Sequence, residues 1–277
     1  MAITSVDNIA AALADVNRPP FYVNRTSIAN TVAGTYHSLW RSSGIPLQAS
    51  IPAAAAACDK TLLGAFNFAS PTGGDKLYLA RSHFINANNG TVIETYDRLA
   101  HMGGLNGTLT TAQTVSLDVN ALSITNKVGR ILQANFSDVS WFLEWYTDTG
   151  GTAVTATVAV TYNDLSTANI TISLVATTRA GRLYPIIVPL AGAGKYIQSV
   201  NTVTLSATTA TAGSFGVTAA RFLTSGQCGM AYIGYVNTWA ETGCPVVPDS
   251  ACLWHVIPAC PTTSTGIIVG NFNIVES

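Results

Sequence analysis

Alternating hydrophobic and polar positions run through most of the chain and predict β-strands. The most regular example is residues 153–162, where Val154, Val158 and Val160 alternate with threonines. Successive strand side chains point to opposite faces, so this pattern is typical of a strand with one buried face. Similar features predict further strands at residues 21–32, 35–40, 77–85, 91–99, 169–176, 185–190, 197–207, 214–223 and 266–275.

Residues 139–147 differ from the other predicted strands because aromatic side chains fall on both faces. Trp141 and Trp145 share one face, and Phe142 and Tyr146 share the other. Strands that are covered on both sides lose the clean alternation of a half-exposed strand. We therefore expect a central strand at this position.

A helical pattern is present only in the N-terminal segment, residues 5–17. Ser5 can cap this helix, and Ile9, Leu13 and Val16 share one face. The proline pair that follows ends it. Because so short a helix is marginal alone, we expect its apolar face to pack on a partner subunit.

The succession of antiparallel strands without intervening helices predicts an all-β antiparallel sandwich, jelly-roll-like in type. We expect residues 1–75 to form the N-terminal helix and an arm whose strands join the core, and residues 76–223 to form the sandwich. Residues 203–223 also predict a hairpin that turns at Gly213. Residues 224–277 are rich in Cys, Gly and Pro and predict an irregular segment that packs on the sandwich or on a neighbour.

The composition is unusual because only 10% of the 277 residues are charged, while 48% are hydrophobic. A typical soluble domain has about 25% charged residues. One interpretation is a Thr- and Ser-rich β-protein that is kept soluble by hydroxyl groups. The interpretation that we favour is that neighbouring subunits cover much of the surface, since charged residues are depleted at interface cores.

The charge pattern also excludes two classes of partner. The net charge of −1 provides no basic patch for nucleic acid or for an anionic membrane. The alanine-rich run at residues 51–58 is far shorter than the roughly 20 apolar residues that a membrane-spanning helix needs. The N-terminus also lacks the basic and apolar regions of a secretory signal.

Five cysteines are present, and four of them lie near the C-terminus. Their positions are Cys58, Cys228, Cys244, Cys252 and Cys260. Zinc sites usually contain a closely spaced cysteine pair, which this chain lacks. Two interpretations stay open: buried thiols, or one or two late-formed disulfides among the last four cysteines. We expect Cys58 to stay free or to pair across subunits.

Candidate catalytic residues are few, so no enzymatic activity, metal or cofactor is expected. None of the four histidines occurs in a zinc-binding spacing. The loop at residues 189–196 lacks the first glycine and the hydroxyl residue of a phosphate-binding loop. Pairing of Cys252 with His255 is possible, but nothing else indicates an activated thiolate.

Glu144 is the one carboxylate that lies among large aromatic residues. With Trp141, Trp145 and Tyr146 it could form a sugar-binding platform with an acid. The interpretation that we favour is that these aromatics are core and that Glu144 pairs with an arginine such as Arg98.

The densest local group of polar side chains is residues 96–107, which include Asp97, Arg98 and His101. In an extended segment, Asp97 and Arg98 point to opposite faces and cannot pair with each other. Each therefore needs another partner, and we expect inter-subunit pairing to supply it.

Residues 96–105 (YDRLAHMGGL), followed by residues 108–117 (TLTTAQTVSL), resemble a recurring pattern in structural proteins of tailed bacteriophages. Residues 35–40, 153–162, 197–207 and 213–223 are similar as well, so the resemblance covers roughly residues 21–223. The resemblance implies a virion component without enzymatic activity or cofactor. The N-terminal helix and the Cys-rich tail lie outside it.

The predicted function is therefore an accessory structural subunit of the virion, as a head decoration or cement protein, with a neck or tail component as the alternative. We expect a cyclic homo-oligomer, with a trimer favoured, that binds major capsid or neck and tail proteins and assembles in the host cytoplasm. The rival from another class is a receptor- or carbohydrate-binding module of a fibre or spike.

Overall fold

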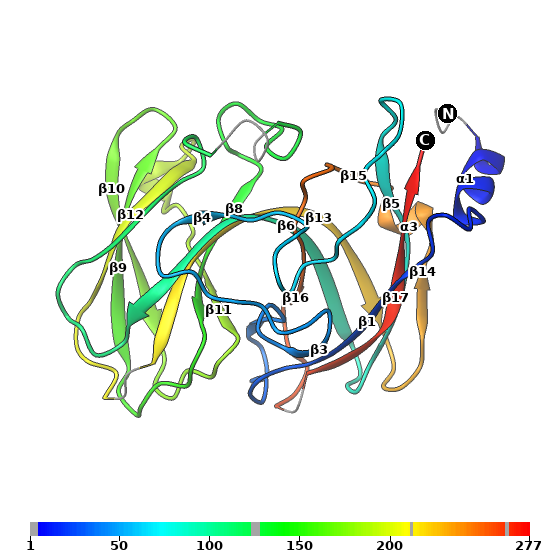
Figure 1. Ribbon diagram of the computed structural model, residues 1–277. Coiled ribbons are helices and arrows are strands. Elements are labelled where there is room, and N and C mark those ends of the chain that lie inside the picture. The colour runs from blue at the N-terminus through cyan, green and yellow to red at the C-terminus, as the bar shows by residue number, and fades with distance from the viewer. Residues whose placement is uncertain (1–4, 123–127, 211–212, 264–265) are drawn as a thin grey trace.

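The computed structural model describes residues 5–122, 128–210, 213–263 and 266–277. The described part is all-β, and every strand pairing is antiparallel. The strands form three sheets, which we name A, B and C (Figure 1). The prediction of an all-β, sandwich-like fold with a short N-terminal helix is confirmed.

Sheet A has the strand order β14-β5-β17-β1-β3, and β15 also pairs with β5. Its strands are β1 (Phe21–Thr26), β3 (Ser43–Ile45), β5 (Leu77–Asn86), β14 (Tyr235–Asn237), β15 (Val246–Val247) and β17 (Ile267–Glu276). Sheet C has the order β10-β9-β12-β7. Its strands are β7 (Gln113–Asp118), β9 (Val154–Tyr162), β10 (Thr167–Leu174) and β12 (Ile197–Leu205).

Sheet B closes on itself, which the sequence did not predict. Its strands are β2 (Tyr36–Ser38), β4 (Ala56–Ala57), β6 (Thr91–Asn106), β8 (Val139–Trp145), β11 (Arg182–Pro185), β13 (Ser214–Cys228) and β16 (Leu253–Ile257). The order is β13-β8-β11-β2-β16-β6-β4, and β13 also pairs with β6. The six strands from β13 to β6 therefore form a closed barrel, and β4 adds to the same edge of β6 as β16.

Three clusters of apolar side chains hold these layers together. The first lies between the barrel and sheet C and includes Trp141, Trp145 and Phe215. The second lies between the barrel and sheet A. The third includes Phe142 and Trp254 and lies on the other face of the barrel strands, which is the barrel interior. The barrel is thus the central layer, with sheet C on one side and sheet A on the other (Figure 1).

The central strand predicted at residues 139–147 is confirmed as β8, which lies between β13 and β11. The hairpin predicted at residues 203–223 is wrong. β12 belongs to sheet C and β13 to the barrel, so the two strands diverge. Part of the strand predicted at residues 185–190 is instead the 3-10 helix η1 (Leu190–Gly192).

The C-terminal residues 224–277 are more regular than expected. They supply the end of β13, three strands of sheet A and the barrel strand β16, together with the short helix α3 (Trp239–Thr242). β17 pairs with β5 on one side and β1 on the other, so it lies inside sheet A. The sheets therefore combine residues from all three segments of the chain.

The N-terminal helix α1 (Val6–Leu13) is shorter than the predicted residues 5–17, and Ser5 caps it as expected. Ile9 is buried, and it lines a small groove of this same chain with Tyr78 and Trp239. Ile9 therefore does not need a partner subunit to cover it. Val16 lies beyond the helix and is 87% exposed.

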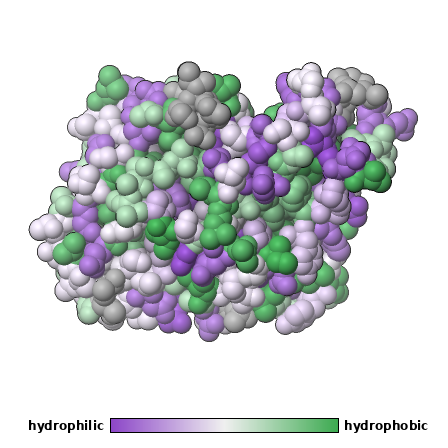
Figure 2. All heavy atoms as spheres, in the orientation of Figure 1, coloured by the Kyte–Doolittle hydropathy of each residue, from purple (hydrophilic) through white to green (hydrophobic). Residues whose placement is uncertain are grey.

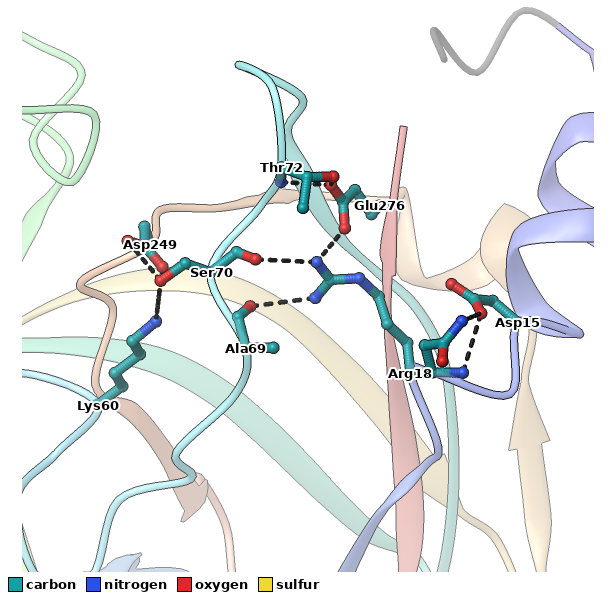
Figure 3. A network of polar contacts seen from close by, with 9 residues as sticks. Asp15, Arg18, Lys60, Ala69, Ser70, Thr72, Asp249 and Glu276 are labelled. Carbon is teal, nitrogen blue, oxygen red and sulfur yellow. Dashed lines mark hydrogen bonds and ion pairs between the residues drawn. The ribbon is translucent and has the colours of Figure 1, made fainter.

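A polar network fastens the N-terminal arm to two distant parts of the chain (Figure 3). The Arg18 guanidinium donates to the carbonyl oxygens of Ala69 and Ser70, at 3.0 Å each, and to the Glu276 carboxylate of β17. Glu276 also accepts hydrogen bonds from Thr72. The arm, the loop before β5 and the last strand are thereby joined.

Candidate functional site: the buried charge cluster

Arg98 and Glu144, two of the polar residues that the sequence singled out, meet inside the barrel. β6 places Arg98 there, and its guanidinium lies between the rings of Trp40 and Trp254. The distances from Arg98 Cζ to the two ring centroids are 4.6 and 4.8 Å. All three side chains are at most 1% exposed. Cation–π contacts are stronger when desolvated, so this stacking stabilises the buried charge.

The Glu144 carboxylate of β8 compensates the charge of Arg98. It accepts a hydrogen bond of 2.6 Å from Arg98 Nη2 and one of 2.8 Å from the Thr218 hydroxyl. The Ser38 hydroxyl donates to the other carboxylate oxygen, and Ser38 Oγ accepts from Trp254 Nε1 at 3.1 Å. The preferred interpretation, that Glu144 pairs with Arg98, is confirmed.

Both members of this pair are charged at neutral pH. Burial acts to raise the pKa of Glu144, but the Arg98 charge and the hydrogen bonds from Ser38 and Thr218 outweigh it, so that pKa is lowered. Burial acts to lower the pKa of Arg98, but the Glu144 charge and hydrogen bond, together with Tyr146 and Cys58, outweigh it, so that pKa is raised. Glu144 is therefore a fixed anion and holds no proton that it could donate as a general acid.

A second buried ion pair joins Asp97 to Arg130. Arg130 Nε donates to Asp97 Oδ2 at 2.8 Å, and the Cys252 amide donates to Asp97 Oδ1 at 2.9 Å. The remaining Arg130 donors bind the carbonyl oxygens of Cys58, at 2.6 Å, and Arg98, at 2.8 Å. Arg130 thus links β6 to two other segments. Sequence reasoning missed it, because it lies in a loop without periodicity.

Asp97, Arg98 and His101 do not form the predicted inter-subunit contact. Their exposed fractions are 0%, 0% and 2%, and the charged pair members have partners in the same chain. His101 Nδ1 lies 2.8 Å from Arg98 Nη2. The expectation that Asp97 and Arg98 lie on opposite faces is consistent with their different partners, but those partners are internal.

The aromatic platform proposed for sugar binding is also wrong. Trp141 and Trp145 pack between the barrel and sheet C and are 3% and 0% exposed. Tyr146 is 3% exposed. A sugar ring could not stack on these side chains without unpacking the fold.

A groove of about 310 Å³ lies beside β8; of its lining tyrosines, Tyr36 and Tyr196 are partly exposed and Tyr96 is buried. Tyr36, Tyr96 and Tyr196 line it together with Ile187, which is 71% exposed. Tyr96 donates a hydrogen bond of 2.9 Å to Glu94. The lining of the groove combines apolar side chains with tyrosines.

All five cysteines are free thiols in the structure. Cys252 forms a side-chain hydrogen bond with Cys58, and not with another cysteine of the tail. Both side chains are fully buried. Cys228 and Cys260 are buried as well, and Cys244 is partly exposed.

Within residues 5–122, 128–210, 213–263 and 266–277, no group of three or more His, Cys, Asp or Glu side chains could hold a metal ion. Over the same ranges, no helix has the length and apolar character that crossing a bilayer requires.

No protein-family model matches this chain, and no curated protein matches it. Among solved structures, the chain is similar to the VP2 subviral particle of infectious bursal disease virus, at 11% identity over 99% of this chain and 87% of that chain, with a TM-score of 0.19. T=1 particles derived from the same virus match at 11% identity, with 97% and 83% of the chains covered and a TM-score of 0.18. TM-scores this low carry no argument about the fold or role of the chain.

The cluster therefore has a structural use. Its charged atoms are enclosed, paired and bound by backbone groups from segments far apart in the sequence. Loss of one member of a buried pair is strongly destabilising, because the other charge is then left without its partner. The ion pairs and hydrogen bonds of this site connect strands and loops of the barrel to one another.

Proposed function

We propose that this chain is a non-enzymatic structural subunit of a tailed-phage virion, and that it acts as a capsid decoration or cement protein. The observation that carries the proposal is the distribution of its few charges. The chain has 13 basic and 14 acidic residues, 27 in all, and within the part that the structure describes six of them are buried: Arg25, Asp97, Arg98, Arg130, Glu144 and Arg221. The outer surface therefore has even fewer charges than the composition implies, and such a surface favours association.

The resemblance to tailed-phage structural proteins supports the same role. The segments that carry it correspond to β2, β6, β7, β9, β12 and β13, which form much of the barrel and sheet C. We propose a cyclic homo-oligomer, with a trimer favoured, that binds major capsid proteins and is assembled in the host cytoplasm. Neck or tail proteins are the alternative partners, and neither nucleic acid nor membrane is a partner.

The absence of catalysis is part of the proposal. Glu144, the strongest acid candidate, is 1% exposed and accepts hydrogen bonds from four side chains of the same chain. A general acid must reach its substrate within hydrogen-bond distance. Rigid cross-linking, rather than proton transfer, is what this arrangement supports.

Quantitative mass spectrometry of purified particles tests the proposal. Isotope-labelled peptides of this chain and of the major capsid protein give the number of copies per particle. We expect hundreds of copies, spread over the head. A few dozen copies or fewer would indicate the neck, the tail or a fibre, and absence from the particle would contradict the virion role.

The groove lined by Tyr36, Tyr96 and Tyr196 favours receptor binding as the second candidate, because aromatic rings with hydroxyl groups are common in polar ligand sites. A glycan array of the full chain and of Tyr196→Ala tests this candidate. Binding that is lost in the variant would favour a receptor-binding module over a cement protein. No glycan binding by either protein would favour the structural role.

A further inference from the structure

Sheet A ends in two short strands that lie at its opposite sides. β14 is the last strand on one side and β3 is the last strand on the other. In the part of the chain that the structure describes, β14 pairs with β5 only and β3 pairs with β1 only. Each strand therefore has one open side, where backbone N–H and C=O groups can pair with another chain.

The first open side, which we name the β14 edge, consists of residues 230–247. Exposed apolar residues are concentrated there: Met230, Tyr232, Ile233, Tyr235, Val236, Trp239 and Val246 are between 38% and 75% exposed. β14 and β15 follow each other along the outer side of β5, with α3 between them. Residues 222–240 contain no charged residue.

The second open side, which we name the β3 edge, consists of residues 43–47. All three residues of β3 are exposed, and Ile45 and Leu47 are 49% and 66% exposed. Tyr22 of the neighbouring β1 is 50% exposed. Green hydrophobic residues lie in the lower central part of the face in Figure 2, where Figure 1 places β3. Residues 42–58 also contain no charged residue.

These edges lack the charged residues that usually prevent strand addition. Natural edge strands carry lysines or other charges for that purpose. The chain has 27 charged residues in 277, yet both open edge strands, β3 and β14, fall in uncharged stretches of 17 residues or more (residues 42–58 and 222–240). Glu241 of α3 is the one charged residue of the β14 edge, and it lies beyond β14 itself. Two uncharged apolar strands match each other, and neither offers an ion pair to a charged partner.

We propose that the β14 edge of one copy adds to the β3 edge of a second copy, so that sheet A continues from subunit to subunit. This proposal rests on the homo-oligomer of the proposed function and names its interface. Every copy offers one edge of each kind, so the contact is head-to-tail and a closed rotation makes a ring. Both strands have three residues, and Pro46 directly follows β3. The added pairing is therefore short, and the apolar side chains around it supply the remaining contact.

Sedimentation velocity of the full-length protein at micromolar concentration tests the contact. Val236→Lys places a charge on the β14 edge, and Ile45→Glu places one on the β3 edge. Both side chains are nearly half exposed, so the fold tolerates the changes. We expect an oligomer for the unchanged chain and monomers for both variants. Leu165→Lys, at a 72% exposed site beside sheet C, is the control and should stay oligomeric.

Mixing the variants tests the head-to-tail geometry. The Val236→Lys chain keeps its β3 edge and the Ile45→Glu chain keeps its β14 edge, and the two altered edges place lysine opposite glutamate. An equimolar mixture should therefore recover the oligomer, although each variant alone is a monomer. A chain with both changes places lysine and glutamate at the same contact and should assemble again. Circular dichroism confirms that each variant is folded.

Two results would overturn the proposal. If Ile45→Glu still dimerises alone, the contact joins two β14 edges and is not head-to-tail. If the unchanged chain is a monomer, the interface does not exist. The virion role is tested separately by the copy-number measurement. A monomer present in hundreds of copies per particle would contradict this inference and the proposed homo-oligomer, but not the role in the virion.

Discussion

Single residues inside the barrel determine much of its stability. Arg98 is enclosed by Trp40, Trp254 and Glu144, and its Nε and Nη1 atoms have no hydrogen-bond partner. The indole rings partly replace those missing bonds. Buried Arg98 therefore depends on the Glu144 charge more than a fully hydrogen-bonded arginine would.

Glu144→Gln should lower the free energy of unfolding by about 3 kcal/mol, because it leaves the Arg98 charge buried without a partner. The double variant Arg98→Met/Glu144→Gln should lose less than the single variant, since it removes both charges. Urea unfolding of both proteins measures the difference. The control is Asp164→Asn, whose ion pair with Lys195 is solvent-exposed and should have little effect. A single variant as stable as the control would contradict a structural role for the pair.

His255 makes the fold sensitive to acid. Burial, with a smaller effect of the Arg25 charge, lowers the pKa of His255 to about 3, and its ring packs among Phe66, Phe84 and Phe272. The ordinary pKa of histidine is about 6.5. Between these values the unfolded chain binds a proton that the folded chain does not. The stabilisation is therefore complete above pH 6.5 and decreases as the pH falls towards 3.

Urea unfolding at pH 7 and pH 5 measures this effect. We expect His255 alone to account for a loss of about 2 kcal/mol between the two values. His255→Phe should retain that amount at pH 5. His37, whose pKa burial lowers to about 4, remains in the variant, so some pH dependence persists. An unchanged pH dependence in His255→Phe would show that His255 is protonated in the folded chain.

The cysteines should differ in their reactivity. Cys244 is the only one of the five that is not buried, so iodoacetamide should modify it in the native protein while the other four react only after unfolding. Burial raises the pKa of Cys244, partly offset by a hydrogen bond with Thr242, so the reaction should be slow at pH 7. Mass spectrometry counts the labels. Fewer than five labels after unfolding without reductant would establish a disulfide.

At the scale of elements, the positions of the strands along the chain could be predicted more easily than the pairing of each strand with its neighbours. The alternation at residues 153–162 predicted β9 to within one residue. Alternation shows that one face is buried, but it does not identify the adjacent strand. The contacts that close the barrel join β6 to β13, more than 100 residues apart. No local pattern carries that information, and the predicted hairpin at residues 203–223 failed for the same reason.

The sequence predicted one ion pair of the candidate site and missed its other contacts. The aromatic residues around Glu144 indicated a buried partner, and Arg98 was named correctly. Arg130 and the contact between Cys58 and Cys252 were missed, because they join irregular segments to strands. The inter-subunit assignment of Asp97 failed because its true partner lies in such a segment.

Arg18 should control how firmly the N-terminal arm is held. Arg18→Ala removes its bonds to Ala69, Ser70 and Glu276. We expect faster amide hydrogen exchange in α1 and unchanged exchange in the barrel strands, since local contacts limit local opening. Arg81→Ala, at an exposed position of β5, is the matched control. Equal exchange in both variants would show that Ile9 alone holds the helix.

The whole molecule combines a charge-poor outer surface with two buried ion pairs, Arg98–Glu144 inside the barrel and Asp97–Arg130 on the other face of β6. The flanking sheets cover the barrel on two sides, and sheet A leaves both of its edges open. A subunit that works alone would be expected to protect those edges with charge. A subunit that works in an assembly can leave them apolar.

The most direct test of this account is the binding of the purified full-length chain to particles that lack it. Co-sedimentation over a range of concentrations measures the bound copies, and the heat needed to rupture the heads measures their stability. The account predicts saturable binding at a fixed number of copies and a higher rupture temperature. A chain that stays in the supernatant at micromolar concentration, and leaves the rupture temperature unchanged, would contradict it.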